Sequence, residues 1–309
     1  MPEGHSIHRL ARQFADVFTG ERLAVSSPQG RFAVGAALLD GHVLTGSTAH
    51  GKHLFLRFEH GLSLHVHLGL YGAWNFGGDS TFRGASSIGA PRRVGEREDR
   101  DAGADAVNDD AAYAGPPAPV GAVRVRLAGS HGWADLRGAT TCETLTEGET
   151  EAVMARLGPD PLRNLPGDRE AFVATLGRRK TPLATLLMDQ KVIAGVGNVY
   201  RAELLFRQRL NPWLPGTGLP AGDAGLLWDD TAAIMADGVR DGRIITTGPR
   251  YWSGGGEAFE GEGAALPAPE EAHFVYRRQG QDCRVCGTPV SLVEHAARKL
   301  YWCTVCQQR

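Results

Sequence analysis

Apolar residues recur every three or four positions near the start of the chain, which is the spacing of one buried helix face. They are Ile7, Leu10, Ala11, Phe14, Val17 and Phe18. Pro2 precedes this series and Gly20 follows it, and these residue types are typical of the start and the end of a helix. The pattern therefore predicts a helix that docks one face against the rest of the protein.

Short β-rich runs alternate with glycine-containing turns from about residue 22 to 76, and the pattern resumes at 122–138. This alternation predicts an antiparallel β-sandwich or barrel. Residues 77–120 carry Gly, Ala, Asp, Arg and Pro with almost no large apolar residues. Such a segment gains too little from burial to offset its ordering entropy, so we predict a disordered insertion there.

Helical patterns dominate the second half of the chain. The predicted helices cover 143–157, 168–177, 182–190, 198–209 and 223–239. We therefore predict an α+β protein of two domains, with an N-terminal helix plus antiparallel β-sandwich in 1–140 and a helical domain in 141–250.

The formal net charge of the 309-residue chain is -2, so any surface for a polyanionic partner must be local. No apolar run approaches the ~18 to 20 residues that a membrane span needs. The first residues also lack the charged and apolar regions of a signal peptide. We expect a cytoplasmic protein, and a monomer.

Four of the five cysteines lie in the last 27 residues, as the pairs Cys283/Cys286 and Cys303/Cys306. Two close thiolate pairs are typical of a closed tetrahedral Zn²⁺ site that is structural rather than catalytic. We predict one structural zinc ion and a zinc-ribbon hairpin in 273–309. His295, Arg298 and Lys299 lie between the pairs, so the hairpin presents cations suited to phosphate contact.

The second residue carries unusual chemistry if Met1 is removed, because Pro2 then becomes a secondary amine. An α-amino group with a reference pKa near ~8 has a useful neutral fraction at pH 7. Attack on a sugar C1′ would give an iminium, which is an electron sink for elimination of the 3′ phosphate, and Glu3 is placed to act as acid or base. Pro and Glu also begin ordinary helices, so these two residues alone leave both interpretations open.

A glycine-bearing linker, VIAGVG, separates two apolar helices within residues 180–213. Gly195 and Gly197 permit backbone conformations closed to other residues. They would aim the Asn198 cap and the amides of the following helix at an anion such as phosphate. A plain helical hairpin is the alternative.

Together these features resemble the formamidopyrimidine-DNA glycosylase and endonuclease VIII family of bifunctional base-excision repair enzymes. The resemblance covers nearly the whole chain apart from 77–120. The shared motifs are the MPEG start, the Gly51-Lys52 turn, LHVHLGLYG, RLGPDPL at 156–162, the helix–two-turn–helix with GVGNVYRAELLF, FVYRRQG at 274–280 and the zinc hairpin. The active cleft is then expected between the two domains.

The resemblance implies roles for individual residues. Pro2 would be the Schiff-base nucleophile and Glu3 the acid that helps to open the sugar. Lys52 and Arg298 would bind phosphates and assist the first and second eliminations. The residues implied in further phosphate recognition are His67, Arg156 and Asn198. The implied partner is damaged DNA, whose target base would be swung out of the double helix. The protein would therefore associate with the nucleoid. The chemistry would need neither a metal nor a nucleotide cofactor.

Leu70 and Tyr71 fall where family members wedge into the space left by the flipped base, although plain strand packing is the alternative. The LYG motif is similar to the endonuclease VIII branch, which removes oxidised pyrimidines. The start MPEGHSIHRLA resembles the actinobacterial relatives of this branch. Gly69 departs from that branch, where a polar residue pairs with the orphaned base. Rival hypotheses are the same chemistry on oxidised purines, a catalytically silent damaged-DNA-binding protein, and a zinc-ribbon accessory factor that binds protein or RNA.

Overall fold

The computed structural model describes residues 2–90, 115–253 and 266–309. The chain divides into two compact units, Met1–Arg156 and Leu157–Arg309. The boundary therefore lies at 156 rather than at the predicted 140. The reason is that β9 (Thr141–Leu145) pairs with a strand of the first unit and α3 (Glu147–Met154) packs on the same sheet.

The first unit contains one antiparallel ladder of nine strands in the order β6-β5-β8-β7-β1-β2-β3-β4-β9. Its other strands are β1 (Arg22–Ser26), β2 (His42–His50), β3 (His53–Phe58), β4 (Ser63–His67), β5 (Ala73–Gly78), β6 (Ser87–Gly89), β7 (Val123–Ala128) and β8 (Gly132–Arg137). Strand β1 pairs with β2 on one side and β7 on the other, and both halves of the ladder contribute to one apolar core. The predicted antiparallel β-sandwich is confirmed.

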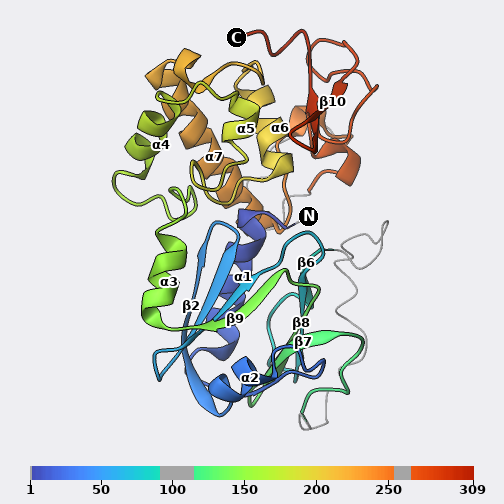
Figure 1. Cartoon of the computed structure of the whole chain (residues 1–309). Coiled ribbons are helices and arrows are strands. Elements are labelled where there is room, and N and C mark those ends of the chain that lie inside the picture. The colour runs from blue at the N-terminus through green and yellow to red at the C-terminus, as the bar shows by residue number, and fades with distance from the viewer. Residues whose placement is uncertain (1, 91–114, 254–265) are drawn as a thin grey trace. The chain divides into compact units, whose positions relative to one another are not determined.

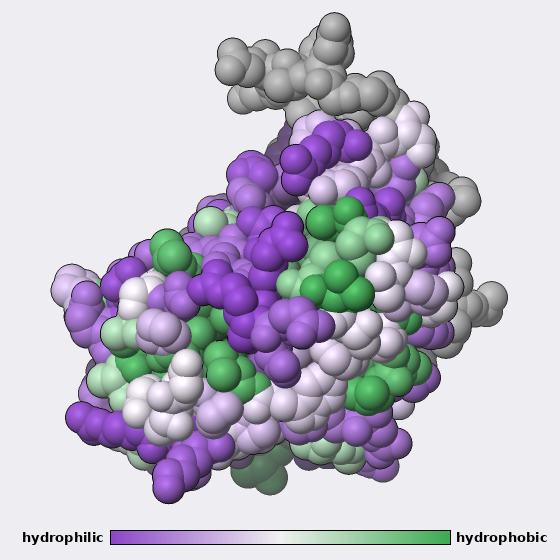
Figure 2. Space-filling model, turned by 90° about the horizontal axis from the view of Figure 1, so that it is seen from above, coloured by the Kyte–Doolittle hydropathy of each residue, from purple (hydrophilic) through white to green (hydrophobic). Residues whose placement is uncertain are grey.

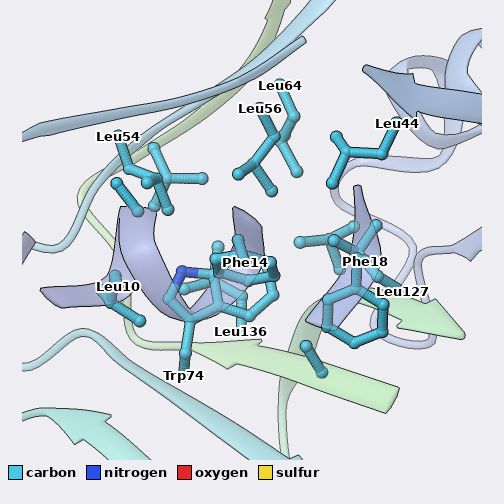
Figure 3. Packing of buried hydrophobic residues seen from close by; sticks show 14 of the residues in the cluster. Leu10, Phe14, Phe18, Leu44, Leu54, Leu56, Leu64, Trp74, Leu127 and Leu136 are labelled. Atoms are coloured by element: carbon cyan, nitrogen blue, oxygen red, sulfur yellow. The ribbon is translucent and has the colours of Figure 1, made fainter. Parts of the chain in front are cut away.

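Helix α1 (Gly4–Phe18) fills the centre of that core, as the sequence periodicity predicts. Figure 3 shows Leu10, Phe14 and Phe18 among leucines of both sheet halves. The Phe14 ring meets Trp74 edge-on at 4.8 Å between centroids, a favourable aromatic geometry. Helix α2 (Ala33–Leu39) contacts strands β1 and β9.

The prediction of a disordered insertion at 77–120 is wrong for the part that the structure describes. Strand β6 pairs with β5, and Ile88 is buried. Gln13 of α1 exchanges two hydrogen bonds with the Ala85 backbone. At the other end of the segment, Arg126 donates to the Pro117 carbonyl. A few anchoring contacts thus order a stretch of low apolar content, while residues 91–114 lie outside the described residues.

The second unit is built from helices (Figure 1). These are α4 (Asp168–Leu176), α5 (Leu183–Leu186), α6 (Asn198–Arg207) and α7 (Ala221–Asp241), with 3-10 turns η1 (Gly216–Gly218), η2 (Pro249–Tyr251) and η3 (Pro269–Glu271). Two predicted helices are shorter than expected by more than two residues. Residues 143–145 belong to β9 rather than to α3, and α5 covers only four residues of the predicted 182–190, because the chain turns after Leu186 through backbone bonds such as Val192 N to Asp189 O.

A two-stranded sheet, β10 (Ser291–His295) and β11 (Arg298–Trp302), follows in the second unit. Leu300 of β11 belongs to the core formed by the helices, so this hairpin shares the hydrophobic core of the second unit.

Among the described residues, none of the helices combines the length and the apolar character that a membrane span requires. Figure 2 shows one face of the molecule, on which hydrophilic residues run between separate apolar patches.

Replacing Phe14 tests whether α1 is the centre of the first core. Phe14→Ala should lower the free energy of unfolding by about 3 to 5 kcal/mol, the usual cost of removing a buried aromatic ring. Arg12→Ala, at an exposed position of the same helix, should change it by less than about 0.5 kcal/mol. Urea denaturation followed by circular dichroism measures both. Equal effects of the two substitutions would contradict the assignment.

Candidate active site and metal centre

The first two residues after Met1 are fixed at the start of α1. Pro2 is buried, and Glu3 has no exposed side-chain surface. Glu3 has extended backbone and precedes the helix as its N-cap, while its carbonyl accepts from the Ser6 N–H. Burial, followed by the charge of Arg9, lowers the pKa of His5 to about 3. This histidine therefore stays neutral beside the N-terminus at physiological pH.

Lys52 lies on the tight turn between β2 and β3. Gly51 takes a positive φ of 57°, which glycine adopts without steric cost, and His50 and His53 close the hairpin. His67 ends the adjacent strand β4 and lies opposite His53 in the register. The sheet therefore brings the predicted phosphate ligands Lys52 and His67 to the same end of the paired strands β3 and β4.

Sequence reasoning missed a chain of hydrogen bonds that begins beside Lys52. The Nδ1 atom of His53 lies 2.8 Å from Nε2 of His65, and Nδ1 of His65 lies 2.8 Å from Oε1 of Glu143. The three residues come from β3, β4 and β9, where cross-strand neighbours share one face. The only sequence signal was the alternation of histidine with apolar residues in these strands.

Leu70 and Tyr71 occupy the turn between β4 and β5, with 51% and 81% of their surfaces exposed. Plain strand packing, the alternative interpretation, does not fit such exposure. Gly69 starts this turn with a φ of 66°, and an added Cβ would stand 1.9 Å from Oγ1 of Thr140. The turn that presents the two side chains therefore requires glycine at 69, which accounts for the departure from the polar residue expected there.

The four C-terminal cysteines form the predicted metal site. Their sulfur atoms all lie within 4.8 Å of one another, with 3.9 Å between Cys283 and Cys306 and 3.4 Å between Cys286 and Cys303. Four sulfurs at about 2.3 Å from Zn²⁺ stand roughly 3.8 Å apart in a tetrahedron, so the cluster fits the ion. Hydrogen bonds from Thr288 lower the pKa of Cys286 to about 6, which favours the thiolate that binds zinc.

Arg298 is exposed at the tip of the hairpin that this cluster braces. It pairs with His295 across a turn whose residues Ala296 and Ala297 have φ values of 50° and 57°. His295 is anchored in turn, because its Nε2 lies 2.7 Å from the Thr185 hydroxyl. The hairpin tip is thus fixed against α5, and it holds the Arg298 backbone in place.

Asn198 does not cap α6 as predicted, because Gly197 is the N-cap residue. Its side chain is used instead to join the helix to the hairpin. The Asn198 amide donates to the Lys299 carbonyl at 2.9 Å, and its oxygen accepts from Arg201 at 2.5 Å. Arg201 also donates to the Lys299 carbonyl. The structure therefore brings Asn198 next to the strand that carries Arg298.

Glu203, further along α6, is another residue that sequence reasoning missed. It is fully buried and accepts three backbone hydrogen bonds, from Phe274, Val275 and Tyr276, and a fourth from the Thr246 hydroxyl. A carboxylate paired in this way is a strong structural tie. It connects α6 to the FVYRRQG segment that leads into the zinc module.

Arg156, the last residue of the first unit, is exposed. Its Nε donates to the Ala152 carbonyl at the end of α3. The predicted site residues are thus divided between the units: Pro2, Glu3, Lys52, His67, Leu70, Tyr71 and Arg156 belong to the first, and Asn198, Arg298 and the cysteines belong to the second.

Three family models match the chain. They are the formamidopyrimidine-DNA glycosylase N-terminal domain at residues 1–113, the H2TH domain of the same family at 157–248, and the zinc finger found in FPG and IleRS at 280–309. Endonuclease 8 1 of Mycobacterium bovis is 41% identical over 99% of this chain and 100% of its own length. A probable endonuclease 8 2 of Streptomyces coelicolor is 31% identical over 99% of this chain and 94% of its own.

Solved structures of the same family have the same fold. The MutM (Fpg) protein of Thermus thermophilus aligns with a TM-score of 0.68 at 24% identity, over 99% of this chain and 98% of that one. A Lactococcus lactis Fpg in complex with DNA containing an abasic site aligns with a TM-score of 0.71 at 17% identity, over 99% of this chain and 100% of that one.

A substitution at Gly69 tests whether this turn requires glycine. Gly69→Ala should lower the free energy of unfolding by about 1 to 2 kcal/mol, because a side chain at positive φ is strained. Gly148→Ala is the matched control, since Gly148 lies in α3 with nothing near its missing Cβ. It should raise stability by about 0.5 to 1 kcal/mol. Thermal and urea unfolding measure both, and a neutral Gly69→Ala would refute the constraint.

Metal analysis tests the cysteine cluster. The purified protein should hold one zinc ion per chain, and Cys303→Ser should lose it, together with the order of the hairpin, because zinc contributes on the order of 10 kcal/mol to folding such modules. Cys142→Ser should keep full zinc content, because Cys142 lies on β9, where burial raises the pKa of its thiol to about 12. Atomic emission spectroscopy decides between these outcomes, and full zinc in Cys303→Ser would overturn the assignment.

Proposed function

This chain belongs to the formamidopyrimidine-DNA glycosylase and endonuclease VIII family, and we propose that it excises oxidised pyrimidines and cleaves the strand through a Schiff base at Pro2. Its class of activity is that of the family: it is a bifunctional DNA glycosylase and apurinic/apyrimidinic lyase of base excision repair. The observation that carries the residue assignment is the burial of Pro2 and Glu3 at the fixed start of α1.

The chemistry follows from the Pro2 amine once Met1 is removed. Its nitrogen attacks C1′ of the damaged nucleotide while the bond to the base breaks, and Glu3 supplies the proton that opens the sugar. The resulting iminium accepts the electron pair left by removal of a C2′ proton, so the 3′ phosphate leaves. A second elimination releases the 5′ phosphate and leaves a one-nucleotide gap.

Phosphate binding is divided between the two units. In the first, we assign the phosphates near the lesion to Lys52. His67, at the same end of strands β3 and β4, and Arg156, after α3, complete this set of phosphate ligands. In the second, Arg298 binds the phosphates that flank the flipped nucleotide and assists the second elimination. Asn198 is assigned to phosphate recognition beside it, and its side-chain amide also holds strand β11 through the Lys299 carbonyl. Phosphate contacts of this kind fix the register of the protein on DNA without reading its sequence.

The preference for oxidised pyrimidines rests on the turn at 69–71. Its exposed Leu70 and Tyr71 suit an apolar wedge in the space left by a flipped base, which offsets part of the cost of unstacking. The names of the two relatives, endonuclease 8, favour the same branch. The enzyme would act as a monomer on damaged DNA at the bacterial nucleoid. Oxidised purines are the alternative substrate.

Borohydride trapping tests the nucleophile. The Met1-processed protein should form a covalent adduct with duplexes that contain an abasic site or thymine glycol, and trapping should be weaker with 8-oxoguanine. Pro2→Gly should trap at least about tenfold less, because a primary amine replaces the oriented secondary one, and an N-terminal extension that blocks the amine should abolish the adduct.

A control separates lost chemistry from lost binding. Binding of a duplex with an uncleavable abasic analogue should be similar for the wild type and the extended form. Tight binding by the wild type with no adduct on any substrate would instead identify a catalytically silent damaged-DNA-binding protein. Stronger trapping with 8-oxoguanine than with thymine glycol would assign the enzyme to oxidised purines.

A further inference from the structure

Three ionisable side chains form a continuous hydrogen-bonded chain across the outer face of β9, β4 and β3. It runs from Glu143 through His65 to His53, with 2.8 Å at each of its two links. The opposite face of β3 and β4 contributes its leucines to the core. The chain therefore ends at His53, whose neighbour in sequence is Lys52.

The middle of this chain is rigidly held. His65 is 3% exposed, and its ring stacks on Phe55 with 4.8 Å between centroids. The rings of His53 and His65 are nearly parallel, with an interplanar angle of 13°. The Glu143 side chain, by contrast, is 47% exposed. Solvent therefore reaches the carboxylate end, whereas the link between the imidazoles is protected.

The hydrogen positions follow from the donors and acceptors. An ionised carboxylate only accepts, so Nδ1 of His65 carries the hydrogen that Glu143 receives. In a neutral imidazole, Nε2 of His65 then accepts, and Nδ1 of His53 must donate to it. The remaining nitrogen, Nε2 of His53, is left with a lone pair. Among the described residues, the structure gives this atom no hydrogen-bond partner.

Burial is the main reason why both histidines are neutral at rest. Burial, then the neighbouring His67, His65, His50 and Lys52, lower the pKa of His53 to about 3. Burial also lowers the pKa of His65, while the hydrogen bond and charge of Glu143 act in the opposite direction and Arg156 adds to the lowering. A proton on this chain is therefore best accommodated at His65, the histidine that pairs directly with a carboxylate.

We propose that Glu143, His65 and His53 form a proton relay that accepts, at Nε2 of His53, the proton released from C2′ during the first elimination. The proposal rests on the proposed function, which places a phosphate at Lys52 next to the end of the relay. As the C2′–H bond breaks, its electron pair moves into the C1′–C2′ bond and toward the iminium nitrogen. The proton binds Nε2 of His53, the Nδ1 hydrogen of His53 passes to Nε2 of His65, and the His65 imidazolium stays paired with Glu143.

Single-turnover cleavage of a preformed abasic site isolates this step from base excision. His53→Phe should slow elimination by about a hundredfold, the lower range for a proton acceptor in a transition state. Glu143→Gln keeps an acceptor for His65 but loses the charge that stabilises the imidazolium, so it should slow elimination by about tenfold. Glu147→Gln is the matched control, because Glu147 lies nearby on α3 and contacts Arg57 instead.

Borohydride trapping and the affinity for an uncleavable abasic analogue should be the same in all these variants, since Schiff-base formation precedes the step. Loss of trapping in the wild type would defeat the proposed function and is thus distinguishable from failure of the relay. If the Glu143→Gln and His53→Phe variants cleave at the wild-type rate, or lose affinity in proportion to rate, the relay is wrong.

The hydrogen positions can be measured without any substrate. Long-range ¹⁵N–¹H spectra of the protein labelled at histidine should show His53 and His65 as neutral Nδ1–H tautomers at pH 7. Glu143→Leu should release His65 from that tautomer, whereas Glu147→Gln should not. A hydrogen on Nε2 of His53 in the resting enzyme would overturn the proposal, because the acceptor would already be occupied.

Discussion

The docking of α1 against the sheet is the constraint on which the rest of the first unit depends. Leu10, Phe14 and Phe18 are each at most 1% exposed, and full burial of such side chains stabilises the fold by about 1.5 to 3 kcal/mol each. Both halves of the antiparallel ladder close on this helix (Figure 3). Because Pro2 and Glu3 directly precede its first turn, the same packing that forms the core also fixes the two residues to which we assign the nucleophile and the acid.

In the second unit, hydrogen bonds and the metal site hold the hairpin that carries Arg298 in place. The hairpin that carries Arg298 has only five residues in each strand, and such a hairpin is marginally stable alone. Zinc braces one end, while the Asn198 and Arg201 side chains hold the Lys299 carbonyl near the other. Glu203 ties the preceding FVYRRQG segment to the same helix. One helix, α6, thereby positions both the hairpin and its approach.

Features encoded by local spacing could be predicted from the sequence. The periodicity of α1 and the spacing within each cysteine pair are local patterns, so their interpretation did not depend on the fold. Contacts between distant residues could not be predicted in this way. His65 meets Glu143 across 78 positions, and Asn198 meets Lys299 across 101. Only the strand order and the packing of the hairpin make those pairs neighbours.

The same limit explains the wrong predictions. Low apolar content led to the prediction of disorder in 77–120, yet burial of Ile88 and the two hydrogen bonds between Gln13 and the Ala85 backbone hold its described N-terminal part. Burial can be supplied by a neighbouring element as well as by the segment itself. The composition of a segment reports only its own apolar residues. It therefore underestimates order wherever another element, such as α1, supplies the packing and hydrogen-bonding contacts.

The charge pattern around Lys52 completes the physical account of the site. Histidine, unlike arginine, can lie close to a lysine without repulsion as long as burial keeps it neutral. The three histidines nearest that turn on β3 and β4 all have lowered pKa values. Cationic binding is therefore left to Lys52 in this part of the sheet, and the imidazoles remain available for hydrogen bonding. The phosphate binding and the proton transfer that we propose here need this separation, because a protonated histidine could bind the anion but could no longer accept a proton.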